Sequence, residues 1–179
     1  PRPGDDIYVS GTLGDARLAL EALQGHITLP ADVLAAARLR LEQPTPRVAL
    51  GQALRGVASS ALDVSDGLLG DLGHILRASG TGACIDTFIA IDSPLTISAR
   101  GQFDPELFHQ CTLAGGDDYE LAFTAPVARR AAVAAASLAS STPVTRIGRI
   151  EAEPGLRLVD AQGQPVVQRY ASFDHFAAG

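Results

Sequence analysis

The stretch SALDVSDGLLGDLGHILRAS, residues 60–79, predicts a strand, an acidic turn and a helix in direct succession. Its first five residues form a short and largely apolar run, which indicates a short buried strand. From Gly67 to Ser79, leucine and isoleucine recur at the spacing of one helix face, and Gly80 follows as a stop signal. A strand that leads through a turn into an amphipathic helix is typical of a layered α/β structure.

The alternation of strand and helix continues on both sides of this stretch. Short β-branched runs alternate with runs rich in alanine and leucine, which predicts a mixed α/β layer structure. We expect strands over residues 7–10, 83–91, 119–124 and 144–150, a closing hairpin from 156–159 and 166–167, and helices over 16–23, 31–41, 47–57, 103–111 and 127–138.

The composition is that of a globular protein with a sizeable core, since 46% of the 179 residues are hydrophobic and 19% are charged. The net charge of −6 argues against a nucleic-acid groove, which needs a basic face. No apolar run approaches the ~18 residues of a membrane span, and no signal peptide begins the chain. We therefore expect a cytoplasmic protein that binds neither nucleic acid nor membrane. The absence of methionine fits a sequence that begins inside a longer protein, and proteolysis or removal of the initiator methionine would give the same kind of start.

The first acidic turn, Asp63-Val64-Ser65-Asp66-Gly67, has two interpretations. Helix capping by Ser65 or Asp66 explains one residue, but it does not explain a carboxylate at Asp63, where burial in a strand would be costly. A divalent cation between Asp63 and Asp66 would remove that cost. It would also leave the Ser65 hydroxyl or the backbone N–H groups for phosphate oxygens. Both interpretations remain open from these residues alone.

The second acidic turn, Gly115-Gly116-Asp117-Asp118-Tyr119-Glu120, carries three carboxylates in four residues. Their mutual repulsion favours a cation or a positively charged ligand, and a solvated turn is the alternative. Alternation along the following strand predicts that Asp118 and Glu120 lie on one side, with Asp117 and Tyr119 on the other. The turn can therefore face two ways.

A third turn, Gly11-Thr12-Leu13-Gly14-Asp15, precedes a predicted helix. Backbone N–H groups at such a helix start can bind phosphate, but the turn lacks the Lys-Ser/Thr ending of a P-loop and the third glycine of a dinucleotide-binding fingerprint. We interpret it as a tight structural turn.

The motifs occur together in one order: Gly4-Asp5, Gly11-Thr12-Leu13-Gly14-Asp15, Pro44-Thr45-Pro46-Arg47, Asp63-Val64-Ser65-Asp66-Gly67-Leu68, Gly115-Gly116-Asp117-Asp118-Tyr119-Glu120-Leu121, Ile147-Gly148-Arg149 and Phe173-Asp174-His175-Phe176. In this combination the whole chain resembles the C-terminal domain of thiamine-monophosphate kinases, in the superfamily of aminoimidazole-ribonucleotide synthetase and selenophosphate synthetase. The resemblance implies an α+β fold of three α/β/α layers with a mixed sheet. It also implies that residues 1–179 are one C-terminal domain, and that the N-terminal ATP- and metal-binding domain precedes them.

The activity implied by the resemblance is phosphorylation of thiamine monophosphate to thiamine diphosphate by direct transfer from ATP, with Mg²⁺ as cofactor. The full-length protein is expected to be a homodimer, formed mainly through the N-terminal domain. The isolated chain is expected to be inactive.

The resemblance also implies residue roles. Asp63 and Asp66 would be magnesium ligands, with Asp66 the most critical, and Ser65 would contact the nucleotide. Asp117 and Phe173 would bind the thiamine substrate. The sequence has Asp117 where glutamate is usual in the family, and Phe173 where tyrosine or tryptophan is frequent.

Three alternatives are considered beside this interpretation. Another ATP-dependent synthetase of the same superfamily would share the motifs, and a non-catalytic metal- or nucleotide-binding module would share the acidic turns. A haloacid-dehalogenase-like phosphatase with Asp63 as nucleophile is weaker, because its second aspartate would fall at the position of Ser65.

Overall fold

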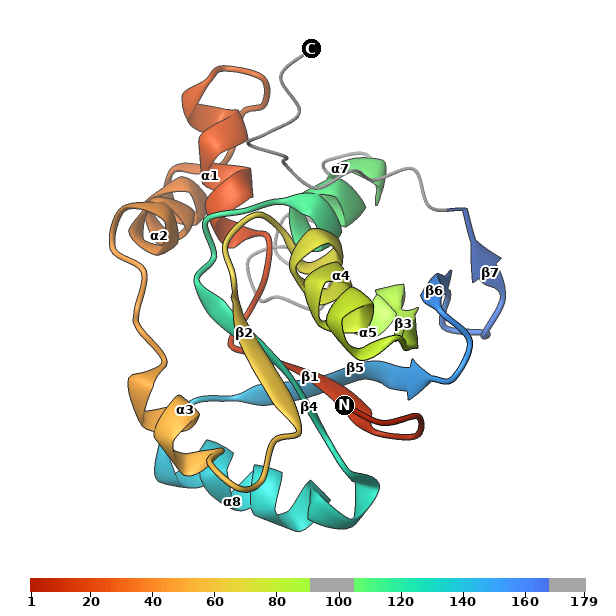
Figure 1. Cartoon of the computed structure of the whole chain (residues 1–179). Coiled ribbons are helices and arrows are strands. Elements are labelled where there is room, and N and C mark those ends of the chain that lie inside the picture. The colour runs from red at the N-terminus through yellow and green to blue at the C-terminus, as the bar shows by residue number, and fades with distance from the viewer. Residues whose placement is uncertain (91–104, 168–179) are drawn as a thin grey trace.

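The computed structural model describes residues 1–90 and 105–167 of the chain (Figure 1). The described strands are β1 (Asp6–Ser10), β2 (Ser60–Val64), β3 (Gly82–Asp86), β4 (Glu120–Ala125), β5 (Val144–Glu151), β6 (Gly155–Val159) and β7 (Pro165–Val166). Within these ranges they form one seven-stranded sheet in the order β2-β4-β1-β5-β3-β6-β7. Neighbouring strands are antiparallel except β3 and β6, which are parallel, so the sheet is mixed.

The described helices are α1 (Asp15–Leu23), α2 (Ala31–Glu42), α3 (Val48–Ala53), α4 (Leu68–Ser79), α5 (Thr87–Ala90), α7 (Pro105–His109) and α8 (Arg130–Ala139), with a π-helical turn η1 (Gln110–Ala114) after α7 and a 3₁₀ turn η2 (Val127–Arg129) before α8. Helix α4 lies on one face of the sheet, and α3 and α8 lie on the other (Figure 1).

The core explains these layers. Because side chains alternate along β1, Ile7 and Val9 face the cluster that contains the buried leucines of α4, while Tyr8 faces the opposite cluster. On that opposite face the Tyr8 ring stacks on Phe123 at 5.1 Å between ring centroids, and Leu50 of α3, Leu54 just after it and Val133 of α8 complete the packing. The predicted three-layer α+β fold with a mixed sheet is confirmed.

One predicted strand is shorter than expected. Strand β3 ends at Asp86, and residues 87–90 turn into α5 instead of continuing the strand to residue 91. The Asp86 carboxylate accepts hydrogen bonds from the backbone N–H groups of Phe88 at 3.0 Å and Ile89 at 3.1 Å. Aspartate stabilises a helical turn in this way, so it ends the strand despite the apolar residues that follow.

The predicted burial of residues 60–64 is wrong. Strand β2 lies at the edge of the sheet and pairs only with β4 among the described strands. Val64 is buried, but Ala61 and Asp63 on the other side of the strand are exposed. The burial cost that argued for a cation at Asp63 therefore does not arise.

Candidate functional site

The two acidic turns lie against each other. The pairing of β2 with β4 continues beyond the strands, because the backbone N–H of Tyr119 donates to the carbonyl of Val64 at 3.0 Å and that of Asp117 donates to the carbonyl of Ser65 at 2.9 Å. A side chain at Gly116 would overlap the Ser65 carbonyl, with its Cβ only 2.4 Å from the oxygen. Glycine is therefore required for this close approach.

Four predicted site residues reach solvent from these turns. Asp63 is exposed, and Ser65, Asp66 and Asp117 are partly buried. We call these four residues the acidic rim. A small ion or a phosphate group can approach the rim from solvent.

The backbone of the first turn is already bonded within the protein. The N–H groups of Ser65, Asp66 and Gly67 all donate to Oδ2 of Asp71, at 2.9, 3.0 and 3.2 Å respectively. The expectation that these N–H groups are open to phosphate is therefore wrong.

The Asp71 carboxylate is buried beside the rim. Burial raises its pKa above the usual range for aspartate, while the N–H groups of the turn oppose that rise. The negative charge of Asp66 also raises the pKa of Asp71, so the two carboxylates interact electrostatically. A cation at the rim would relieve this repulsion.

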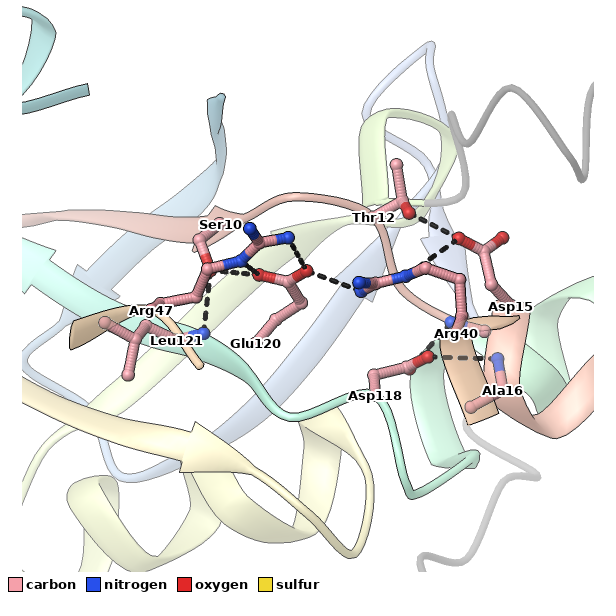
Figure 2. Close-up of polar contacts among 10 residues, drawn as sticks. Ser10, Thr12, Asp15, Ala16, Arg40, Arg47, Asp118, Glu120 and Leu121 are labelled. Carbon is pink, nitrogen blue, oxygen red and sulfur yellow. Dashed lines mark hydrogen bonds and ion pairs between the residues drawn. The ribbon is translucent and has the colours of Figure 1, made fainter. Parts of the chain in front are cut away.

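In the second turn, Glu120 is fully buried and its carboxylate lies between the side chains of Arg47 and Arg40 (Figure 2). Its carboxylate accepts hydrogen bonds from Arg40 Nη2 at 2.5 Å, from Arg47 Nε at 2.7 Å and Nη2 at 2.6 Å, and from the Ser10 hydroxyl at 2.5 Å. The Glu120 carboxylate in turn raises the pKa of the Arg47 guanidinium. Two guanidinium groups thus compensate the buried carboxylate.

Asp118 is held by the start of α1 (Figure 2). Its carboxylate accepts hydrogen bonds from the backbone N–H groups of Gly14 at 2.7 Å and Ala16 at 3.3 Å. Burial raises the pKa of Asp118 to about 8. The turn at residues 11–15 therefore binds a carboxylate of the same chain at this helix start, which supports its interpretation as a structural turn.

The predicted alternation in the second turn is confirmed. Asp118 and Glu120 are buried, whereas Tyr119 is 43% exposed and Asp117 is partly buried. The inward carboxylates need no external cation, because the protein supplies N–H groups and arginines. Asp117 and Tyr119 have left-handed backbones, with φ of 70° and 52°. Such conformations are uncommon for residues other than glycine and are frequent at functional sites.

An apolar cleft of about 420 Å³ lies beside the rim. Its walls include Pro44, Pro46 and Leu121, and Asp63 and Tyr119 also line it. A volume of this size falls within the range of about 300–1,000 Å³ that is common for small-molecule sites.

The assignment of Asp63 and Asp66 as magnesium ligands stays a prediction. Within residues 1–90 and 105–167, no cluster of three or more histidine, cysteine, aspartate or glutamate side chains is arranged to hold a metal. Mg²⁺ commonly needs only one or two carboxylates, because water and substrate phosphates fill the other positions. Asp63 and Asp66 offer that number of carboxylates.

The structure leaves one predicted residue unplaced and adds others. Phe173 lies outside the described residues. Sequence reasoning assigned no role to Asp71, Arg40 or Arg47. An acidic residue in the first turn of α4 was a signal for Asp71, and Arg47 stood in the motif Pro44-Thr45-Pro46-Arg47, while nothing local marks Arg40. Across the described ranges, no helix has the length and apolar character needed to span a membrane.

Comparison with known proteins places these features in context. A family profile described as "AIR synthase related protein, C-terminal domain" matches residues 2–161. Thiamine-monophosphate kinase of Escherichia coli (strain K12) is 41% identical to the chain over 181 aligned positions, which cover 98% of this chain and 54% of the relative. The chain thus spans about half the length of the curated relatives it matches.

Solved structures agree with that result. Thiamine-monophosphate kinase from Stenotrophomonas maltophilia K279a has 41% sequence identity and a TM-score of 0.79, over 92% of this chain and 52% of that one. A structure described as AaThiL complexed with AMPPCP and TMP has 29% identity and a TM-score of 0.78, over 98% of this chain and 52% of that one. The resemblance inferred from the motifs is confirmed.

Proposed function

This chain belongs to the family of AIR synthase related proteins, whose C-terminal domain it matches, and on that premise we propose that it is the C-terminal half of an ATP-dependent thiamine-monophosphate kinase. The observation that carries the proposal is the acidic rim, where two sequence motifs far apart in the chain meet through the Asp117 to Ser65 hydrogen bond. Relatives that match almost all of the chain are thiamine-monophosphate kinases, which supports the same function.

The proposed reaction is a direct phosphoryl transfer. A phosphate oxygen of thiamine monophosphate attacks the γ-phosphorus of ATP, the bond to the β–γ bridging oxygen breaks, and ADP leaves. Two anionic phosphates must approach each other in this step. Bound Mg²⁺ would offset part of their charge.

The residues of the rim have separate roles in this proposal. Asp63 and Asp66, three residues apart in the first turn, would hold Mg²⁺. Ser65 lies between them and contacts the nucleotide through its hydroxyl. Asp117 binds the thiamine substrate, as does Phe173. The apolar cleft beside Asp63 gives room for the ring system of a phosphorylated substrate.

We propose further that the other half of the enzyme precedes this chain and provides the remaining ATP and metal contacts. The proposal is supported by the match of this chain to 54% of its curated relative. A homodimer formed mainly through that half, a cytoplasmic location and inactivity of the isolated chain belong to the same proposal.

Replacement of Asp66 by asparagine in the full-length protein tests the function. We expect thiamine diphosphate formation from ATP and thiamine monophosphate to fall by about 100-fold or more, because a neutral ligand holds Mg²⁺ less well. The melting temperature should change little, since Asp66 is not part of the core.

Asp160→Asn is the matched control. The Asp160 carboxylate lies in the hairpin between β6 and β7, where it accepts backbone N–H groups of Gln162 and Gln164. This variant should keep wild-type turnover. Wild-type turnover by Asp66→Asn would contradict the metal assignment. ATP-dependent turnover of formylglycinamidine ribonucleotide, with none of thiamine monophosphate, would assign the protein to a sibling synthetase.

A further inference from the structure

The geometry points to Asp71 as a positioning residue, which fixes the turn that carries Ser65 and Asp66 in the orientation needed for metal and nucleotide. This inference rests on the proposed function, because it assigns a role in the same site. Asp71 itself lies in the first turn of α4, next to the acidic turn that contains Ser65 and Asp66.

A single oxygen atom of Asp71 organises three successive residues. Its Oδ2 accepts the N–H groups of Ser65, Asp66 and Gly67, all within 3.2 Å. Three amides that converge on one acceptor restrict the φ and ψ angles between them. The directions of the Ser65 and Asp66 side chains are therefore set largely by Asp71.

The turn is also held from its other side. The Ser65 carbonyl accepts the N–H of Asp117, so the N–H side of the turn is bonded to α4 and the carbonyl side to the second acidic turn. Asp71 is only 6% exposed and Gly67 is buried, so water is a poor substitute for the carboxylate. Loss of the carboxylate would leave partly buried N–H groups without their acceptor, which favours a rearranged turn.

The Asp71 carboxylate also lies next to the proposed metal ligand, because it accepts a hydrogen bond from the N–H of Asp66 at 3.0 Å. Asparagine at this position would keep one oxygen as an acceptor but remove the charge, whereas alanine would remove both.

Two measurements on full-length Asp71→Ala and Asp71→Asn test the inference. The first is amide hydrogen exchange of the peptide that spans residues 64–68, without metal or nucleotide. The second is the Mg²⁺ concentration that half-saturates binding of AMPPCP. For Asp71→Ala we expect faster amide hydrogen exchange in that peptide. We also expect the half-saturating Mg²⁺ concentration to rise by about 10- to 100-fold, which is the usual effect of removing a group that orients metal ligands. Asp71→Asn should show the smaller change in exchange, because its oxygen remains.

Asp160→Ala is the control, because Asp160 also accepts two backbone N–H groups but lies in the distant β6–β7 hairpin. Asp160→Ala should change amide hydrogen exchange only in that hairpin. It should leave the Mg²⁺ concentration that half-saturates AMPPCP binding at the wild-type value. The inference is overturned if Asp71→Ala keeps native exchange at residues 64–68, or if exchange rises while the Mg²⁺ dependence is unchanged. If Asp71→Ala does not fold, Asp71→Asn decides by the same criteria. Neither measurement needs turnover, so failure of thiamine monophosphate as a substrate would refute the kinase proposal separately.

Discussion

Asp118 is buried against the first residues of α1, where its carboxylate accepts N–H groups of Gly14 and Ala16. Burial raises the pKa of Asp118 to about 8, so the folded protein retains a proton there that the unfolded chain releases near pH 4, about the ordinary aspartate pKa. The contribution of Asp118 to the free energy of unfolding is therefore largest at low pH. It falls as the pH rises from about 4 to about 8 and is constant above that range.

Asp118→Asn isolates this effect. Wild type should lose more stability between pH 5 and pH 8 than the variant does, as measured by urea unfolding at both pH values. Burial lowers the pKa of His109, which favours stability at the higher pH, but this contribution is common to both proteins and cancels in the comparison. An identical pH dependence for the two proteins would contradict the assignment of a proton to Asp118.

Glu120 gives a second prediction for single residues. Arg47→Ala would leave this fully buried carboxylate with Arg40 as its remaining ionic partner. We expect a loss of about 3 kcal/mol in the free energy of unfolding, because a buried charge is then poorly compensated. Chemical denaturation of wild type and Arg47→Ala measures this loss of stability.

Arg38→Ala is the control for Arg47→Ala. It removes a pair with Glu42 on the surface of α2, where both side chains are nearly half exposed. Such pairs contribute about 0.5 kcal/mol or less. Equal effects of the two arginine substitutions would refute the importance of the buried cluster.

The buried partners of Glu120 were beyond sequence reasoning. Arg40 and Arg47 are 80 and 73 residues away from Glu120 in the chain. Only the tertiary fold, in which α2 packs on α1 and the segment before α3 runs past β4, brings them together. The side that each acid faces was predicted correctly, although only Glu120 belongs to β4 and the backbones of Asp117 and Tyr119 are left-handed.

At the scale of elements, the order of strands and helices followed from periodicity, since each amphipathic pattern is contained in one segment. The end of β3 did not, because two backbone N–H groups that donate to the Asp86 carboxylate outweigh the strand preference of the apolar residues beyond it. The edge position of β2 was also hidden, since it depends on which strand pairs with β4. The contact between the two acidic turns follows from that pairing.

Gly116→Ala tests the contact between the turns. The new Cβ would overlap the Ser65 carbonyl, so the turns must separate, and overpacking of this kind costs about 1–3 kcal/mol of stability. The free energy of unfolding measures the cost, and kinase activity of the full-length protein should fall with it.

Gly51→Ala is the matched glycine control. Its Cβ would meet only the Leu121 side chain, at the ordinary contact distance of 3.8 Å, within helix α3. This substitution should be neutral or stabilise by up to about 1 kcal/mol, because alanine is the better helix former. Equal destabilisation by both substitutions would contradict the close approach at Gly116.

At the scale of the whole molecule, three layers place the acidic rim at one edge of the sheet, where β2 and the residues before β4 leave side chains exposed. The layer architecture was predictable from the alternation of elements and from the family resemblance. The chain matches only about half of its relatives, such as 54% of the Escherichia coli protein. That another half of the enzyme completes the rim is part of the proposed function.

The most direct test is formation of thiamine diphosphate from thiamine monophosphate, ATP and Mg²⁺, measured for the full-length protein and for the 179-residue chain alone under the same conditions. The proposed shared site predicts product from the full-length protein and none above background from the chain. Absence of product from the full-length protein would contradict the kinase function, and full turnover by the chain alone would contradict a site divided between two halves.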